Sequence, residues 1–147
     1  MKIAIVTGAS SGMGRETAVQ LADRFAGFGE IWLVARREER LSQLEEILPV
    51  PVRKFAIDLT DREQLAELET ALQNEQPDVK ILVNASGYGK MGRVGSVSTE
   101  EETGMVRLNC EALCAVTHMV LPYMSKNSRI IQYASSASFL PQPGFAI

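Results

Sequence analysis

The chain has 147 residues, and its 15 Lys and Arg against 18 Asp and Glu give a formal net charge of −3. Hydrophobic residues make up 46% and charged residues 22% of the sequence, which excludes long disorder and fits one domain over residues 1–147. The mild acidity, the lack of a basic block and the lack of a long apolar run argue against nucleic-acid or membrane partners and against secretion, so a cytoplasmic chain is expected.

Residues 2–7 are short, apolar and β-branched, which predicts a strand buried on both faces. Residues 13–25 then carry apolar side chains at helical spacing. Residues 31–35 repeat the strand pattern and residues 37–48 the helical pattern, which Pro49 ends. The side chains expected to face the core from the two helices are Ala18, Leu21, Ala22 and Phe25, and Leu41, Leu44, Ile47 and Leu48.

The alternation of strands and helices continues through the middle of the chain. Residues 52–57 predict a third strand, although two basic residues interrupt its apolar pattern. Residues 61–74 predict a helix, with Thr60 or Asp61 as its N-cap. Residues 79–83 then form an apolar run that predicts a fourth strand.

The last third of the chain begins with a glycine-studded loop at 86–96. Residues 99–126 predict a capped helix start and a long, largely apolar helix, with a break expected near Gly104. Residues 129–133 predict a fifth strand, and residues 134–147, which contain two prolines, predict a loop.

Every connection between the five expected strands includes a helix. This pattern requires parallel strands with right-handed crossovers, and it predicts an α/β fold with a doubly wound parallel sheet in the order 3-2-1-4-5. The fifth strand would then lie at an open edge. Because an unpaired apolar edge promotes association, an isolated chain of residues 1–147 is expected to be poorly soluble or self-associated.

A glycine-rich turn follows the first strand, with glycines at 8, 12 and 14 in the spacing G-x-x-x-G-x-G. This spacing differs from the G-x-G-x-x-G dinucleotide fingerprint, but it offers the same physical properties. Glycines permit a tight turn and close approach of a pyrophosphate, and the next helix presents free N–H groups and the positive end of its dipole. An ordinary strand–helix turn is the alternative, and the position after the first strand favours nucleotide binding.

With these motifs the chain resembles a short-chain dehydrogenase/reductase, because residues 7–14 match the family's Thr-Gly-x-x-x-Gly-x-Gly motif in full. Residues 84–87 resemble the family's Asn-Asn-Ala-Gly with two substitutions, and Asp58 resembles the acid that contacts the adenine amino group. The resemblance implies a Rossmann-type NAD(P)-binding fold, here incomplete at its C-terminal side. The residues it assigns to the cofactor are Gly8, Ser10, Ser11, Gly12, Met13, Gly14, Asp58, Leu59, Asn84, Ala85, Ser86 and Gly87.

The cofactor type can be inferred from charge at the end of the second strand. NAD-selecting folds usually place an acid there to bind the ribose 2′-OH, but this chain has Arg36 and Arg37. Two guanidinium groups suit a 2′-phosphate, so NADP(H) is favoured over NAD(H). In the alternative interpretation the arginines pair with Glu38, Glu39 or solvent.

The reaction that the resemblance implies is hydride transfer between the nicotinamide and a small-molecule carbonyl or alcohol. Ser135 then polarises the carbonyl, with Ser136 as the alternative serine, and Asn109 helps to hold a proton-relay water. The family's proton-donating Tyr-x-x-x-Lys pair is missing, because none of the three tyrosines has a lysine four residues later. Counted from Ser135, the family's tyrosine would fall directly after Ile147, so the chain is expected to lack the catalytic Tyr and Lys.

Two functions from different classes therefore remain open. The first is an NADP(H)-preferring short-chain oxidoreductase, and the alternative is a non-catalytic NADP-binding or redox-sensing module if the polypeptide ends at Ile147. The family further implies a homo-oligomer. Residues 105–124 are the expected contact face, although their apolar side chains could equally form the core of the chain itself.

Cys110, Cys114 and His118 recur every four residues in the long expected helix. Three ligands over two helical turns fit a tetrahedral metal poorly, and no fourth ligand is evident. Two small buried thiols on a packing face are therefore expected in place of a metal site. Cysteines one turn apart on a helix are also poor disulfide partners.

Overall fold

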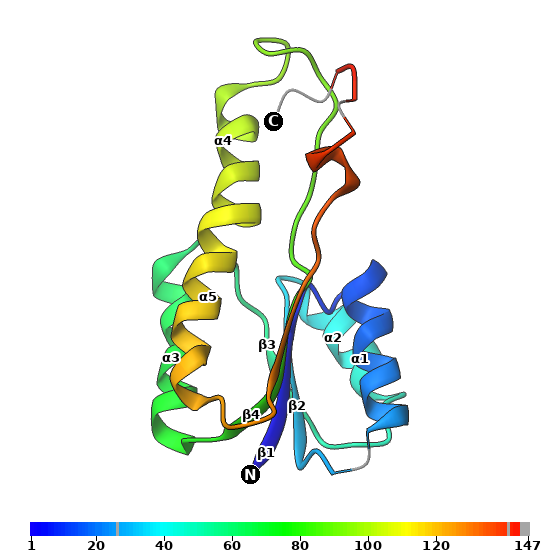
Figure 1. Ribbon diagram of the computed structural model, residues 1–147, viewed down its shortest axis with the longest axis vertical. Coiled ribbons are helices and arrows are strands. Elements are labelled where there is room, and N and C mark those ends of the chain that lie inside the picture. Colours follow the sequence, from blue (N-terminus) through cyan, green and yellow to red (C-terminus); the bar gives the residue numbers. More distant parts are fainter. Residues whose placement is uncertain (26, 141, 145–147) are drawn as a thin grey trace.

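The computed structural model describes residues 1–25, 27–140 and 142–144. Its five strands form one parallel sheet in the order β3-β2-β1-β4-β5 (Figure 1). This is the doubly wound α/β sheet that the sequence predicts. The strands are β1 (Lys2–Thr7), β2 (Glu30–Val34), β3 (Val52–Phe55), β4 (Asp78–Asn84) and β5 (Arg129–Gln132).

Helices cover both faces of the sheet (Figure 1). The first face carries α1 (Gly12–Arg24) and α2 (Glu38–Glu45), and the second carries α3 (Arg62–Glu75) and the long helix. The long helix is built from α4 (Thr99–Val106), a π-helical segment (Arg107–Ala112), α5 (Leu113–Val120) and a 3₁₀ turn (Leu121–Tyr123).

The central strands β1, β2 and β4 are largely buried because alternate side chains enter two separate apolar cores. Ile3 and Ile5 of β1 pack toward the α3 side, and Ala4 and Val6 pack toward the α1 side. Since all four side chains are fully buried, β1 reads as a continuous apolar run without polar alternation. The apolar core thereby fixes the carboxyl ends of the strands along one edge of the sheet.

Two apolar side chains that were expected in the core lie at the surface. Phe25 follows the last turn of α1 and is 52% exposed, and Ile47 is 55% exposed. The prediction fails for Ile47 because α2 ends at Glu45, before the prolines. The backbone N–H of Ile47 bonds three residues back to Leu44, a tightened turn that rotates the side chain outward.

The predicted long helix is present but is not broken at Gly104. Its irregularity lies further on, in the π-helical segment Arg107–Ala112, and the helix ends at Tyr123. Ser98 caps its start by accepting a hydrogen bond from the N–H of Glu101. Asp61, one of the two expected caps of α3, accepts hydrogen bonds from the N–H groups of Glu63 and Gln64.

The prediction of buried thiols is wrong, because Cys110 and Cys114 are both exposed. The stripe that faces the sheet is instead Ala112, Val116 and Val120, two residues further along the helix and therefore on its opposite side. Among the described residues, no three His, Cys, Asp or Glu side chains gather as a metal site.

The loop expected at 134–147 holds one short 3₁₀ turn, Ser136–Ser138, and its residues 141 and 145–147 lie outside the described residues. Within the described ranges, no helix has the length and apolarity needed to cross a bilayer.

Candidate functional site

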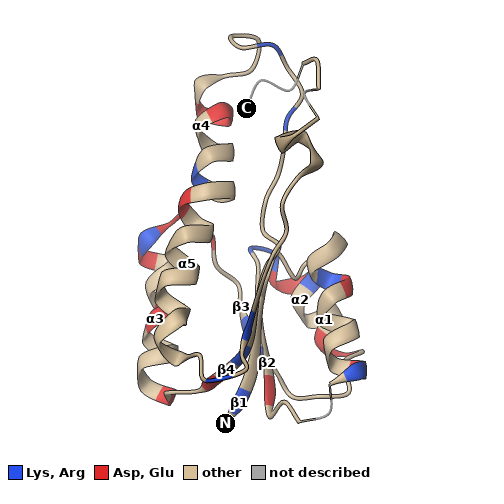
Figure 2. Cartoon of the chain, in the orientation of Figure 1, with Lys and Arg blue, Asp and Glu red and all other residues tan. Residues whose placement is uncertain are grey.

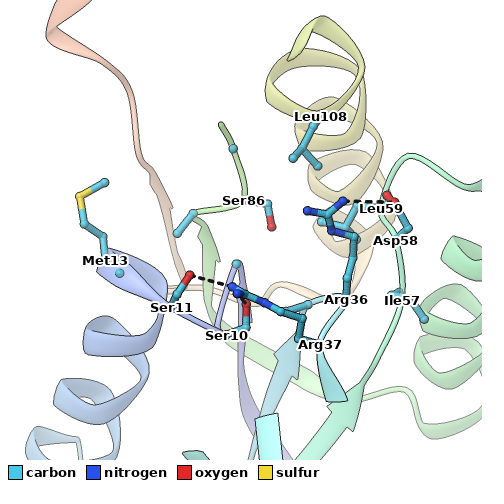
Figure 3. A pocket seen from close by; sticks show the side chains of 15 residues that line it. Ser10, Ser11, Met13, Arg36, Arg37, Ile57, Asp58, Leu59, Ser86 and Leu108 are labelled. Atoms are coloured by element: carbon cyan, nitrogen blue, oxygen red, sulfur yellow. Dashed lines mark hydrogen bonds and ion pairs between the residues drawn. The ribbon is translucent and has the colours of Figure 1, made fainter. Parts of the chain in front are cut away.

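A cavity of about 300 Å³ opens at the carboxyl edge of the sheet, where β1 meets β2 and β4 (Figure 3). Ligands of open α/β sheets bind at this edge, at the point where the strand order reverses. The wall residues come from the segments that follow four strands, from the start of α1 and from the long helix. They are Gly8, Ser10, Ser11, Gly12, Met13, Ala35, Arg36, Arg37, Ile57, Asp58, Leu59, Ala85, Ser86, Gly87 and Leu108.

The floor of the cavity is made by backbone segments that pack too closely for side chains. Gly8 has φ +68°, and a Cβ atom there would lie 2.5 Å from the carbonyl oxygen of Ala85. A Cβ atom at Gly14 would lie 2.4 Å from the carbonyl oxygen of Gly8. The buried Thr7 hydroxyl accepts hydrogen bonds from the N–H groups of Ala85 (3.2 Å) and Ser86 (3.3 Å), so the two segments are held together.

The N-terminus of α1 points its free N–H groups at the cavity. Ser11 is the N-cap, but its side chain makes no capping hydrogen bond, and the first turn carries no acidic residue. The hydroxyls of Ser10 and Ser11 instead accept hydrogen bonds from Nη2 of Arg37, at 3.0 and 3.2 Å. An uncapped helix N-terminus beside a guanidinium group is a favourable environment for an anion.

The two arginines hold different places on the cavity rim (Figure 3). Arg37 lies over the Ser10–Ser11 turn, whereas Nη1 of Arg36 approaches Oδ2 of Asp58 at 3.9 Å with 71% of the side chain exposed. The other oxygen of Asp58 accepts hydrogen bonds from the N–H and the hydroxyl of Thr60. Within the part of the chain that the structure describes, neither arginine pairs with Glu38 or Glu39.

Charge is therefore concentrated where a phosphate would need it. Figure 2 shows the basic turn between β2 and α2 at the carboxyl edge of the sheet. The wall carries two guanidinium groups against one carboxylate, Asp58, whose Oδ2 faces Arg36. Such a wall attracts anionic ligands, and the attraction weakens as salt screens the exposed charges.

Asn84 and Gly14 are the expected cofactor-binding residues that do not line the cavity. Asn84 is buried, and its Nδ2 donates a hydrogen bond to the hydroxyl of Thr117 at 3.0 Å. Gly14 lies below the turn, where it permits the close approach to Gly8. Both residues therefore support the segments that form the wall without lining the cavity themselves.

Asn109 and Ser135 also lie off the cavity wall. Asn109 sits in the π-helical segment, donates from Nδ2 to the carbonyl of Tyr88 (2.8 Å) and accepts at Oδ1 from the Tyr88 N–H (3.0 Å). It therefore holds Tyr88 against the long helix, and with it the start of the remaining loop, residues 88–96, which we call the 88–96 loop. The Ser135 hydroxyl accepts a hydrogen bond from the N–H of Ala137 at 3.1 Å and begins the 3₁₀ turn that contains Ser136.

Three wall residues were missed from the sequence: Ala35, Ile57 and Leu108. Ala35 and Ile57 directly precede the expected residues Arg36 and Asp58, so a signal for them existed in their position at strand ends. Leu108 directly precedes Asn109, but the helical pattern alone does not show that its side chain turns toward the sheet edge.

Comparison with known proteins identifies the same family that the sequence motifs resemble. The family model described as short chain dehydrogenase matches residues 2–147. An uncharacterised oxidoreductase of Staphylococcus epidermidis is 31% identical over 142 residues, which cover 95% of this chain and 60% of the relative. The chain thus spans about three fifths of the length of this curated relative.

Solved structures match nearly the whole chain. A bulky-bulky ketone specific alcohol dehydrogenase from Comamonas testosteroni is 30% identical with a TM-score of 0.84, over 99% of this chain and 59% of that one. L-sorbose reductase from Gluconobacter frateurii, complexed with NADPH and L-sorbose, is 26% identical with a TM-score of 0.85, over 99% and 56%. With the sheet order, the glycine turn and the family match in agreement, the chain belongs to the short-chain dehydrogenase family.

Proposed function

We propose that residues 1–147 form the NADP(H)-binding domain of a short-chain oxidoreductase, which transfers a hydride between the nicotinamide and a small carbonyl or alcohol substrate. The observation that carries the proposal is the convergence of an uncapped helix N-terminus, a glycine floor and two arginines on one cavity. L-sorbose reductase, the structural relative complexed with NADPH and L-sorbose, supports the same reaction class.

The cavity fits a dinucleotide because its floor is bare backbone. The pyrophosphate would lie on the turn from Gly8 to Gly14 and on the N–H groups of α1. Arg37, held by the two serine hydroxyls, and Arg36 would bind a ribose 2′-phosphate. Oδ2 of Asp58 would accept from the adenine amino group, because Oδ1 already accepts two hydrogen bonds from Thr60.

The remaining residues of the cofactor site would hold the ribose and nicotinamide side. The backbone of Ala85, Ser86 and Gly87 lines the cavity beside the glycine turn, with Leu59 and Met13 as apolar walls. When bound, the nicotinamide supplies or accepts the hydride. We assign polarisation of the substrate carbonyl to the Ser135 hydroxyl.

Asn109 would support the proton path, since the π-helical segment around it disturbs the regular helical hydrogen bonding and so leaves backbone groups able to bind water. The reaction of the whole protein also needs a proton donor, for which residues 1–147 contain no Tyr-x-x-x-Lys pair.

Cofactor titration tests the proposal. NADPH should bind more tightly than NADH, and Arg37→Ala should weaken NADPH binding about tenfold or more, since hydrogen bonds to charged groups contribute about 1.5–3 kcal/mol. Arg36→Ala should act in the same direction, and NADH affinity should change little in either variant. Arg40→Ala, an exposed arginine of α2 away from the cavity wall, is the matched control. Equal NADPH affinity in wild type and both variants would exclude the assignment of a 2′-phosphate site.

A second function, NADP binding or redox sensing without turnover, is favoured by one observation. The cavity wall contains neither Ser135 nor Asn109, so binding does not depend on the residues assigned to chemistry. Steady oxidation of NADPH with any member of a panel of aldehydes and ketones would reject this alternative. Tight NADPH binding with no turnover across the panel would favour it.

We further propose that the protein forms homo-oligomers through the long helix. Its outward stripe exposes Val106, Cys110, Cys114 and Leu121, whereas the opposite stripe is buried against the sheet. Exposed apolar side chains along one helix face are typical of contact surfaces. Light scattering of the full-length protein would return a monomer mass if this assignment is wrong.

A further inference from the structure

Two threonines from opposite faces of the sheet make the same hydrogen-bond arrangement, and the first is Thr17 of α1. Its Oγ1 donates to the carbonyl of Met13, one turn back, at 2.7 Å. The hydroxyl of Tyr133 lies 2.6 Å from the same Oγ1. Because a threonine hydroxyl has one proton and Thr17 gives it to Met13, Tyr133 must be the donor of the second bond.

Tyr133 joins three segments that the proposed function needs in register. Its backbone N–H donates to the carbonyl of Asn84 at 3.0 Å, directly after the last pair of the β4–β5 ladder. Its hydroxyl contacts Thr17, which in turn bonds to the carbonyl of Met13. Met13 lies on the cavity wall (Figure 3). Two residues later the chain reaches Ser135.

Thr117 of α5 makes the equivalent contacts on the other face. Its Oγ1 donates to the carbonyl of Leu113 at 2.8 Å and accepts from Nδ2 of Asn84 (3.0 Å) and Nε2 of Gln132 (3.3 Å). Gln132 and Tyr133 are consecutive, so their side chains leave β5 on opposite faces. The carboxyl end of β5 is therefore held on one face by Thr17 and on the other by Thr117, and we call these four residues the threonine clamp.

Among the residues that the structure describes, few contacts besides this clamp hold the end of β5. Within the described residues, β5 pairs with β4 alone, and all of its side chains are exposed. Displacing a catalytic hydroxyl by about 1 Å can cost a hundredfold in rate. We propose that Tyr133 and Thr17 are positioning residues, which set Ser135 in register with the cofactor turn. This inference rests on the proposed function, since it assumes that Ser135 acts beside a bound nicotinamide.

The test uses full-length protein with Tyr133→Phe, Thr17→Val and the double variant. Each single change removes one partner of the hydrogen bond between Tyr133 and Thr17. Because such a bond contributes a modest net free energy, kcat at saturating NADPH should fall about threefold to tenfold. The Kd for NADPH should stay within about twofold, because neither side chain lines the cofactor cavity. The double variant should have a kcat no lower than that of the single variants, since the two residues act through one bond.

Thr17→Ser is the conservative variant. It keeps the hydroxyl and should therefore retain the wild-type kcat.

Thr103→Val is the matched control. Thr103 of α4 also donates to a carbonyl one turn back, Thr99 at 2.8 Å, but among the described residues no strand side chain donates to it. If Thr17→Val lowers kcat no more than this control does, or if the effects of Tyr133→Phe and Thr17→Val multiply, the positioning role is rejected.

Amide hydrogen exchange separates this inference from the proposed function. The N–H groups of Ala137, Ser138 and Phe139 bond within the turn that Ser135 begins. They should exchange faster in Thr17→Val and Tyr133→Phe than in wild type, whether or not the protein turns over a carbonyl. Unchanged exchange would overturn the clamp, whereas a wild type that binds no NADPH and has no turnover would overturn the proposed function alone.

Discussion

Gly8 and Gly12 lie in the same turn and both have a positive φ angle, +68° and +56°, but their surroundings differ. A Cβ atom at Gly12 meets nothing within 4 Å, whereas one at Gly8 lies 2.5 Å from the Ala85 carbonyl oxygen. Gly12→Ala should therefore cost only the left-handed strain, about 1–2 kcal/mol.

Gly8→Ala should cost that strain plus overpacking against backbone, about 1–3 kcal/mol more. Denaturant unfolding of the two variants measures the difference directly. Equal unfolding free energies would show that the turn moves away from Ala85 without cost.

At the same scale, most of the residues that the sequence assigns to the cofactor line the candidate cavity, and their role there stays a prediction. All expected cofactor-binding residues except Gly14 and Asn84 lie on the cavity wall, because a motif fixes positions relative to strand ends. The bond between Tyr133 and Thr17 could not be predicted. The two residues are 116 positions apart, and neither belongs to a motif, so only the folded arrangement brings them together.

At the scale of elements, the contact between the 88–96 loop and α4 depends on a glycine. The Tyr88 hydroxyl donates to the carbonyl of Glu101 at 3.2 Å, and a Cβ atom at Gly104 would lie 2.6 Å from that hydroxyl. Gly104→Ala gains about 1 kcal/mol of helix propensity. It also displaces the tyrosine and loses a bond worth about 0.5–1.5 kcal/mol.

These two effects nearly cancel, so Gly104→Ala should leave the unfolding free energy almost unchanged. In a Tyr88→Phe background the hydroxyl is absent, and the same change should stabilise the protein by about 1 kcal/mol. Denaturant melts of the four proteins complete the cycle. Equal effects of Gly104→Ala in both backgrounds would mean that Tyr88 and Gly104 are not coupled.

Helix α3 gives a pH-dependent prediction. Hydrogen bonds from the backbone N–H and side chain of Gln64, and from the N–H of Glu63, hold the pKa of Asp61 below its ordinary value of 3.8. A carboxylate with a lowered folded-state pKa stabilises the fold fully above pH 3.8 and loses that contribution as the pH falls through the folded value.

Asp61→Asn should therefore be less stable than wild type near neutral pH, and the two melting temperatures should converge in acid. Asp23→Asn removes an exposed carboxylate of α1 and is the control for the change in net charge. A wild type and an Asp61→Asn variant that differ equally at all pH values would show that the carboxylate charge is not involved.

The long helix shows why its buried face could not be read from sequence. Leu113 to Val120 are largely apolar all round, so no single stripe is marked as the packing face. The π-helical segment adds a second uncertainty, because it turns residues after Ala112 relative to those before Arg107. In the structure the buried face of the helix is formed by Ala112, Val116 and Val120, and the two cysteines lie on its exposed face.

For the whole molecule, we expect association in solution to depend on the β5 edge of the sheet, where β5 pairs with β4 alone within the described residues. Ile131 of β5 is 37% exposed and lines a groove against α1. A polypeptide of residues 1–147 should therefore associate beyond the oligomer proposed for the long helix, and Ile131→Lys should remove this additional association, since a charge on an edge strand opposes pairing. Ile47→Lys makes the same change at an exposed site far from the edge and should leave association as it was. Light scattering of the three proteins is the measurement, and a monomeric wild type would contradict the prediction.

The cavity wall begins at Gly8 and ends at Leu108, and Ser135 comes later in the chain. Under the proposed function, cofactor choice and polarisation of the substrate by Ser135 would then be assigned to successive, non-overlapping stretches of the chain. A recombination joint placed in the long helix after Asn109 would exchange one property without the other. A chimera of residues 1–109 with the remainder of an NAD-preferring relative should show the NADPH preference proposed for this chain while keeping the substrate range of that relative.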